Sequence, residues 1–497
     1  MNKKNPYILS IIISIPFILW AILQILPTFD DWTTLSMPNY DPNYLTYILP
    51  FGVTWRPFDA IMGYINAIDY HFYPSLNHVL ILMAHIGSTC VIYKLSKVIG
   101  FNEIATNITT LFFYISPCTM GTILSCDALN QSYSHLWGIL SVFLYIKTAG
   151  KQKYIAWTIC TYLSVLSKDN GLAWAIVPPI IAYTFHFIDK KTFKKDFVLG
   201  LGIAISYAII RLTIPYTYVK NGSYEEDVVS LHSRIKGLVN WVSYTWFAAD
   251  YIAFVPKPFR NLFLGFLTIV LSCTFMIKIW WNKNIWHQKQ IWLLIITLFI
   301  VASPHLLISM SIMNAYSSLG IASLIIGYLI KNYKGGNTTI QKLFLCYIVA
   351  AIITDVHHWY KAWQTSLPGK TIAEDIVRKT GKPVNKVYCI LIRDDMPKFS
   401  SFCVPTDEAV GWGRAVWAIT GTNGQPNYKT LLWNVHPMYS RKPDYWPKTL
   451  RKNMIVYGLS TKKKWRLSNE TSFHHHSVLQ RRKQFDGSLS RLDFIHQ

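Results

Sequence analysis

Long apolar runs, each bounded by Lys or Arg, recur along the first 355 residues of this chain. Each run is about 17 to 22 residues long, which as a helix spans a hydrocarbon core about 30 Å thick. Backbone hydrogen bonds must be satisfied within the segment at that depth, so the runs must be helical. They predict about eleven transmembrane helices, at Tyr7–Leu26, Leu76–Ile99, Ile104–Ile115, Leu129–Ile146, Tyr154–Leu166, Leu172–Phe187, Phe197–Ile214, Leu262–Trp280, Ile291–Ile308, Ala315–Ile330 and Ile340–Thr354.

The composition agrees with a membrane protein. Hydrophobic residues make up 52% of the 497 residues and charged residues only 15%, against about 25% in soluble proteins. The net charge of +23 has two interpretations, a cytoplasmic excess of Lys and Arg or an anionic partner such as lipid phosphate. No segment resembles a nucleic-acid-binding module, so no nucleic acid is expected as a partner.

The lysines lie in every second loop between the predicted spans, so all of them fall on one side of the membrane. The positive-inside rule identifies that side as the cytoplasm. The chain therefore has its N-terminus inside and is anchored in the cytoplasmic membrane by a first span that is too long for a cleaved signal peptide. The stretch Leu238–Phe254 is assigned to an interfacial or re-entrant helix, because a further span would invert every later loop. The lysines concerned are Lys3, Lys4, Lys94, Lys97, Lys147, Lys151, Lys153, Lys190, Lys191, Lys194, Lys195, Lys278, Lys283, Lys289, Lys331 and Lys334.

Two domains are predicted, a transmembrane domain over residues 1–355 and a soluble domain outside the membrane over residues 356–497. The second is polar and basic, and its strand-like segments Val387–Ile392 and Met454–Tyr457 indicate a small α/β fold. The first external loop, from Pro27 to about Ser75, is rich in aromatic residues and is expected to form helices on the membrane surface.

Five short motifs follow one another along the transmembrane part. FDDW carries Asp30 and Asp31 directly after the first span, and TWRPF carries Arg56 in the first external loop. The segment from Tyr73 carries His78 and His85, SKDNG carries Lys168 and Asp169, and NAYSSLG carries Tyr316. Between the second and the fourth of these motifs, a proline-containing stretch from Tyr114 is followed by Asp127 and a span.

This ordered set resembles the GT-C class of membrane glycosyltransferases, which includes protein O-mannosyltransferases, lipid A aminoarabinose transferases and TMTC-type mannosyltransferases. The resemblance covers about residues 10–330. It implies a GT-C-like fold and an enzyme that transfers a sugar from a polyprenyl-phosphate donor. The acceptor would be a cell-envelope glycan, a lipid or a protein on the external face of the membrane.

The resemblance also implies roles for the motif residues. Asp30 matches the catalytic base, which takes the acceptor proton, and Asp31 is the alternative. Arg56 and Lys168 would bind the phosphate and stabilise its charge as it leaves. Asp127 and Asp169 would contact the acceptor or pair with these cations, and His78 and Tyr316 would line the substrate site. No cofactor is expected, although some class members need a divalent metal.

The chain departs from the TMTC pattern at two positions and lacks the tetratricopeptide tail of that group. Ser116 stands where a His is usual, and Gly121 where a Glu is usual. A transporter or flippase, or a non-catalytic scaffold of glycan assembly, therefore stays an alternative.

Several His and Cys residues are expected to have structural rather than functional roles. His78 and His85 favour helix–helix hydrogen bonds over a metal site, and His357 with His358 is expected on a solvated face. Cys118 with Cys126, and Cys389 with Cys403, are either disulfides or unpaired thiols.

Overall fold

The chain divides into two compact units, which are described separately. Unit 1 comprises Met1–Ile22, Leu45–Ile61 and Asn77–Tyr360, and unit 2 comprises Leu23–Tyr44, Met62–Leu76 and Lys361–Gln497. The computed structural model describes residues 6–28, 31–32, 57–58, 61, 75–125, 128–213, 231–248, 252, 260–281, 283–307, 311–380, 388–391, 409, 415, 454–459, 465–467 and 493–495.

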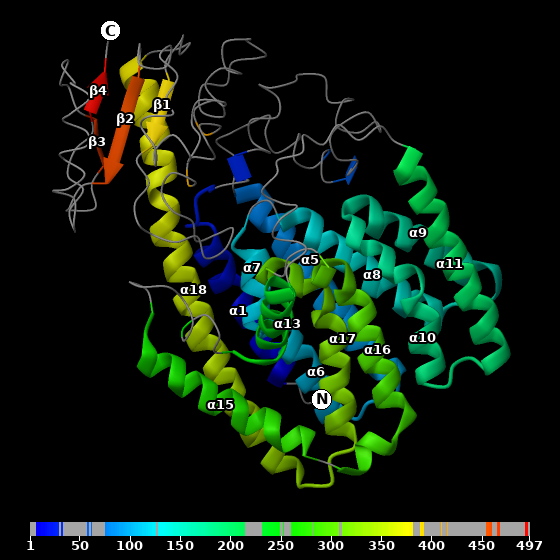
Figure 1. Ribbon diagram of the computed structural model, residues 1–497. Coiled ribbons are helices and arrows are strands. Elements are labelled where there is room, and N and C mark those ends of the chain that lie inside the picture. The colour runs from blue at the N-terminus through cyan, green and yellow to red at the C-terminus, as the bar shows by residue number, and fades with distance from the viewer. Residues whose placement is uncertain are drawn as a thin grey trace. The chain divides into compact units, whose positions relative to one another are not determined.

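Unit 1 is helical throughout its described part (Figure 1). The last helix, α18, continues into unit 2. The helices are α1 (Pro6–Ile22), α5 (Ser75–Val98), α6 (Glu103–Ile115), the 3-10 helix η1 (Pro117–Thr119), α7 (Met120–Ile123), α8 (Leu129–Lys147), α9 (Gly150–Ser167), the 3-10 helix η3 (Asp169–Ala175), α10 (Val177–Thr184), α11 (Lys190–Thr213), α13 (Leu231–Trp246), α15 (Leu262–Trp280), the 3-10 helix η4 (Lys283–His287), α16 (Lys289–Leu307), α17 (Ile312–Lys331) and α18 (Asn337–Thr380).

Within the described residues, five helices are long and apolar enough to cross a membrane: α5, α15, α16, α17 and α18. Each overlaps a span predicted from the sequence, although the helix that contains Ile340–Thr354 continues to Thr380. The length and apolar composition of these helices therefore indicate a helical membrane protein. The total of about eleven spans stays a prediction.

One predicted span has a different structure. Residues 172–187 were expected to form one helix, but the structure divides them between η3 and the eight-residue helix α10. Pro178 and Pro179 lie in the first turn of α10. A proline lacks the N–H that a helix interior requires, so it is tolerated at that position only because the first turn has no such bond to make.

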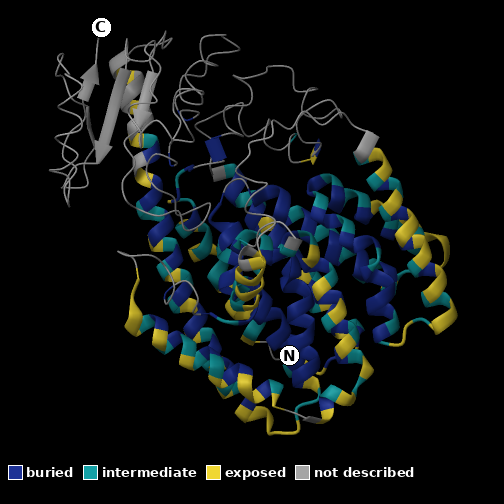
Figure 2. Ribbon diagram, in the orientation of Figure 1, coloured by how far each residue is buried: buried dark blue, intermediate teal, exposed yellow. Residues whose placement is uncertain are grey.

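The buried centre of unit 1 is α17. The apolar stretch of this helix is 89% buried. It packs against α6, α8, α13 and α16. Figure 2 shows it dark along its length, while α11 carries a continuous exposed face. Gly327 lets α17 approach Thr109 and Phe101 closely, since a side chain at that position would overlap both.

Side-chain contacts show which helix ends lie together. Lys153 near the start of α9 pairs with Asp196 near the start of α11 (Nζ–Oδ2 3.0 Å). Phe193 of α11 stacks on Tyr183 at the end of α10, and Tyr183 accepts a hydrogen bond from Lys289 at the start of α16 (3.2 Å). We call this end of unit 1 the lysine end, defined by Lys153, Lys195 and Lys289. The sequence predicted that these lysines would share one side.

Unit 2 contains a small sheet of four described strands, β1 (Tyr388–Leu391), β2 (Met454–Leu459), β3 (Trp465–Leu467) and β4 (Asp493–Ile495). β1 pairs in parallel with β2, and both β3 and β4 pair antiparallel with the other edge of β2. β1 and β2 fall on the two segments predicted as strands. The domain boundary at residue 355 and the location of the second domain stay predictions.

Candidate functional site

The end of unit 1 opposite the lysine end gathers charged and polar side chains from three helices. The SKDNG motif stands at this end, between α9 and η3. Lys168 closes α9, where its extended backbone (φ −156°, ψ 136°) turns the chain out of the helix. We call Lys168, Asp169, Asn170, Arg211 and His305 the KDN cluster.

Asp169 connects the motif to α11. Its Oδ1 accepts a hydrogen bond from the Tyr207 hydroxyl (2.7 Å) and lies 3.6 Å from Arg211 Nε. Both residues come from the last two turns of α11, so one carboxylate holds the end of that helix against the motif. Asp169 thus pairs with Arg211, a cation that was not predicted from the sequence. Its predicted pairing with Arg56 or Lys168 and its predicted contact with an acceptor stay predictions.

Asn170 connects the same motif to α16 and α8. Its Nδ2 lies 2.8 Å from His305 Nε2, and its Oδ1 accepts from the Ser134 hydroxyl (3.5 Å). Asn170 is buried, so these bonds satisfy an amide that would otherwise be costly to remove from water. His305 thus makes a hydrogen bond that joins α16 to the motif.

Gly171 allows the motif to fold back on α9. A Cβ atom at this position would lie 2.5 Å from the carbonyl carbon of Ser164, and Ser164 donates to the Ser134 carbonyl of α8 (2.7 Å). Two small hydroxyl residues and a glycine thus bring α8, α9 and η3 into close contact, as small residues do in membrane bundles.

Replacing Gly171 should therefore destabilise the protein. Gly171→Ala must displace backbone of α9, and overpacking of this kind costs about 1–3 kcal/mol. Gly202→Ala is the control, because nothing lies within 4 Å of a Cβ atom there and alanine favours a helix. The melting temperature in detergent should fall for Gly171→Ala and stay level or rise for Gly202→Ala. Equal melting temperatures would show that the close approach is not needed.

The KDN cluster is cationic. Lys168 is 9% exposed and His305 7%, while the Arg211 side chain is 20% exposed. Arg211 pairs with the carboxylate of Asp169, and Lys168 precedes Asp169 in the chain, so two cations accompany one carboxylate. Arg presents a planar fork of donors that matches phosphate geometry, and Lys adds a point charge. The arrangement is suited to holding an anion at the end of the helices.

The sequence did not single out Arg211. Its signal was available, because Arg211 is the only charged residue in the run Phe197–Thr213. An ionisable residue within an apolar span is by default a candidate for function. The sequence did not show its partner, Asp169, which connects Arg211 to the SKDNG motif.

Asp31 belongs to unit 2 and is engaged in a local turn. Its Oδ2 accepts from the Thr28 N–H (2.8 Å), and its own N–H donates to the Thr28 carbonyl (2.9 Å). Trp32, which follows, is buried and donates from Nε1 to the Ala409 carbonyl (2.9 Å). Asp31 therefore stabilises the turn that begins at Thr28.

Three of the predicted site residues, Asp30, Arg56 and Asp127, lie outside the described residues. Their predicted roles stay predictions.

His78 and Gly121 lie where the start of α5 meets α7. His78 is buried, and its Nδ1 lies 3.1 Å from the Ile123 carbonyl oxygen. A Cβ atom at Gly121 would lie 2.7 Å from the backbone nitrogen of Met313. The space that a Glu would need is thus filled by the start of α17.

Tyr316 belongs to a chain of hydrogen bonds in the centre of the bundle. His135 Nδ1 lies 3.3 Å from Ser88 Oγ, and the Ser88 hydroxyl bonds to that of Tyr316. The Tyr316 hydroxyl lies 3.1 Å from His85 Nδ1, and His85 Nε2 lies 3.1 Å from the Tyr114 carbonyl oxygen. Because a carbonyl oxygen only accepts, the proton of a neutral His85 must be on Nε2. His85 Nδ1 then accepts from the Tyr316 hydroxyl, and the Tyr316 oxygen accepts from the Ser88 hydroxyl. The Ser88 oxygen accepts in turn from His135, which places the proton of His135 on Nδ1.

These two tautomers are measurable. In ¹⁵N-histidine NMR spectra, His85 should show a protonated Nε2 and His135 a protonated Nδ1. Tyr316→Phe should remove the hydrogen bond at His85 Nδ1 and shift that resonance. Tyr328→Phe is the control, because Tyr328 lies on the same helix but bonds to Gln288. A doubly protonated ring, or His85 protonated only on Nδ1, would contradict the proposed direction.

Two expectations about single residues are now decided. His358 was expected on a solvated face, which is wrong, because its side chain is buried in α18. The Cys118 sulfur is a thiol whose Sγ lies 3.8 Å from the Ile312 carbonyl oxygen. Cys126 and Cys403 lie outside the described residues.

No model of a known protein family matches the sequence, and no curated protein matches it. Among solved structures, the chain is similar to the archaeal oligosaccharyltransferase AglB from Archaeoglobus fulgidus in complex with an inhibitory peptide and a dolichol-phosphate. The TM-score is 0.42 at 14% identity, over 81% of this chain and 61% of AglB. The apo form of the Archaeoglobus fulgidus oligosaccharyltransferase gives a TM-score of 0.40 at 13% identity over the same shares. The chain thus spans 61% of the length of these neighbours, and the similarity is too low to assign it to their family.

Proposed function

We propose that this protein is a membrane glycosyltransferase that takes a sugar from a polyprenyl-phosphate donor. The observation that carries the proposal is the KDN cluster, in which Arg211 pairs with Asp169, the residue that follows Lys168, at the end of the helices opposite the lysine end. A lipid-linked phosphate at the membrane boundary is the anion that such a site fits. The ordered motifs of the sequence support the same function.

The proposed reaction is one displacement at the anomeric carbon. A hydroxyl oxygen of the acceptor attacks that carbon, and the bond between the carbon and the phosphate oxygen breaks. The lipid phosphate leaves with the electron pair, and Asp30 takes the proton of the attacking hydroxyl. Lys168, Arg211 and Arg56 stabilise the negative charge that develops on the phosphate oxygens.

Asp30 is assigned as the base and Asp31 as its structural neighbour. The hydrogen bond from the Thr28 N–H to Asp31 supports this division, because it engages one Asp31 oxygen in the turn. His78 and Tyr316 are assigned to positioning rather than to substrate contact, since both are buried and hydrogen-bonded within the bundle. The proposal includes no metal.

Donor turnover tests the proposal directly. The purified protein would be incubated with radiolabelled polyprenyl-phosphate sugars of different sugar types, and release of sugar would be followed with and without envelope acceptors. Slow hydrolysis or transfer from at least one donor is expected. Failure to bind any donor, or polyprenyl phosphate itself, would favour a transporter or a scaffold instead.

A further inference from the structure

The inward face of α11 differs from an ordinary helix contact. Its buried residues are Asp196, Gly200, Ile203 and Tyr207, and Arg211 follows one turn later. The spacing of three and four residues places all five on one side of the helix. Only Ile203 among them contributes an aliphatic side chain.

The opposite face of α11 is apolar and exposed (Figure 2). Val198, Leu201, Ile205 and Ile209 lie on it, each between 39% and 66% exposed. In a membrane this face contacts lipid, and exchanging lipid for protein there gains little. The position of α11 must therefore be set mainly by its inward contacts.

The contacts in the middle of α11 are close but few. Gly200 lies against the Ala175 carbonyl, where a side chain would overlap. Ser206 shares a hydrogen bond with the Tyr162 hydroxyl (2.7 Å), and Ile203 packs into a small apolar cluster around Trp157. These contacts hold α11 against α9 and η3, but a glycine and a hydroxyl do not resist sliding along the helix axis strongly.

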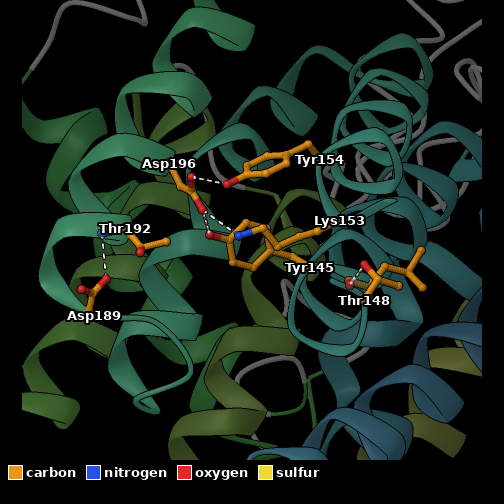
Figure 3. A network of polar contacts seen from close by, with 8 residues as sticks. Tyr145, Thr148, Lys153, Tyr154, Asp189, Thr192 and Asp196 are labelled. Carbon is orange, nitrogen blue, oxygen red and sulfur yellow. Dashed lines mark hydrogen bonds and ion pairs between the residues drawn. The ribbon is translucent and has the colours of Figure 1, made fainter. Parts of the chain in front are cut away.

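Asp196 supplies the strongest attachment (Figure 3). Its carboxylate is fully buried and accepts hydrogen bonds from the Tyr145 hydroxyl, the Tyr154 hydroxyl (3.0 Å) and Lys153 Nζ (3.0 Å). Lys153 Nζ also lies 4.5 Å from the ring centroids of both tyrosines. The two tyrosines and the lysine come from α8 and α9. Removing one partner of such a buried charged network is costly because it leaves the others unpaired.

The same helix carries Arg211 to the KDN cluster. Arg211 follows Asp196 on an uninterrupted helix, about 22 Å further along the axis at 1.5 Å per residue. A helix transmits the position of one end to the other because its backbone hydrogen bonds leave it stiff. Asp169 receives Arg211 at one end, and Asp196 fixes the helix at the other.

We propose that Asp196 is a positioning residue for Arg211, acting through α11 from the lysine end. The three donors around Asp196 set the axial position of the helix, and this sets the distance between Arg211 and Lys168. The part of the claim that concerns phosphate rests on the proposed function. The part that concerns the placement of Arg211 does not.

Hydrogen exchange measured by mass spectrometry tests the placement without any substrate. In Asp196→Asn, exchange should rise about tenfold in residues 206–213 and 168–171, which corresponds to one lost hydrogen bond to a charged group. Asp189→Asn is the control, because Asp189 only caps the start of the same helix, where it accepts from the Thr192 N–H (2.9 Å). Its effect should stay within the first turn of α11.

Tyr154→Phe provides a milder variant should Asp196→Asn fail to fold. It removes one hydroxyl and leaves the ion pair, so the same peptides should show a smaller increase. An increase confined to residues 190–199 in both variants would overturn the proposal, because it would show a local role without transmission to Arg211.

Binding of undecaprenyl phosphate provides the second arm. Asp196→Asn should weaken binding about tenfold in the wild-type background and leave it unchanged in an Arg211→Gln background, since residues acting through one another are not additive. Equal weakening in both backgrounds would overturn the proposal. If the wild type binds no polyprenyl phosphate, the proposed function fails, and the exchange experiment still decides the placement of Arg211.

Discussion

Asp30→Asn should reduce sugar transfer by about 10²- to 10⁴-fold, the usual contribution of a general base. The substitution keeps the size and hydrogen-bonding capacity of the side chain but removes its ability to accept the proton of the attacking hydroxyl. Under the proposed function the donor would still bind, because Lys168 and Arg211 would hold its phosphate. Turnover should therefore fall while the affinity for polyprenyl phosphate changes little, which a radiolabel assay and a binding assay measure separately.

Asp31→Asn is the matched control for this substitution. It should lower the melting temperature through the turn at Thr28, with a loss of about 1 kcal/mol from weakening a buried hydrogen bond. Its turnover, measured on folded protein, should stay within about tenfold of the wild type because Asp31 is not the proton acceptor. The reverse result, with activity abolished by Asp31→Asn and retained by Asp30→Asn, would assign the base to Asp31.

Lys168→Met and Arg211→Gln should each weaken binding of polyprenyl phosphate by about 10- to 150-fold, which corresponds to a lost hydrogen bond to a charged group. Both substitutions keep much of the side chain's length and remove its charge. The effect should diminish at high salt for Arg211, which is the more exposed of the two, because mobile ions screen exposed charges more than buried ones.

Two lysines at the other end of the same helices serve as controls. Lys151 lies near the start of α9 and Lys194 near the start of α11, and both are exposed. Lys151→Met and Lys194→Gln change the net charge by the same amount but lie far from the KDN cluster. If they weaken binding as much as Lys168→Met and Arg211→Gln, the site of phosphate recognition lies elsewhere.

The sequence by itself determined the class of structure. Apolar runs with charged boundaries allow only helices in a membrane, because no other segment satisfies its own backbone there. Within the described residues, the five helices that meet the length and composition of a span all overlap these runs, although α18 extends beyond its run. Three of the lysines that the sequence assigned to one side, Lys153, Lys195 and Lys289, lie at one end of unit 1.

The hydropathy of the sequence did not show where one apolar run is broken. Residues 172–187 are apolar enough for a single span, and the break between η3 and α10 follows from Gly171, which draws the chain against Ser164, and from the two prolines that then begin α10. Hydropathy averages over these positions. Only packing shows that the chain must turn there.

The tertiary structure alone decided how the charged residues are used. Asp169, predicted to contact an acceptor or to pair with Arg56 or Lys168, pairs with Arg211 from a helix about forty residues later. His85 and Tyr316, 231 residues apart, share a hydrogen bond. A sequence shows which side chains are costly to bury, but their partners come from distant helices. The site is therefore a property of the way the helices pack, whereas the helices themselves are a property of the chain's hydrophobic pattern.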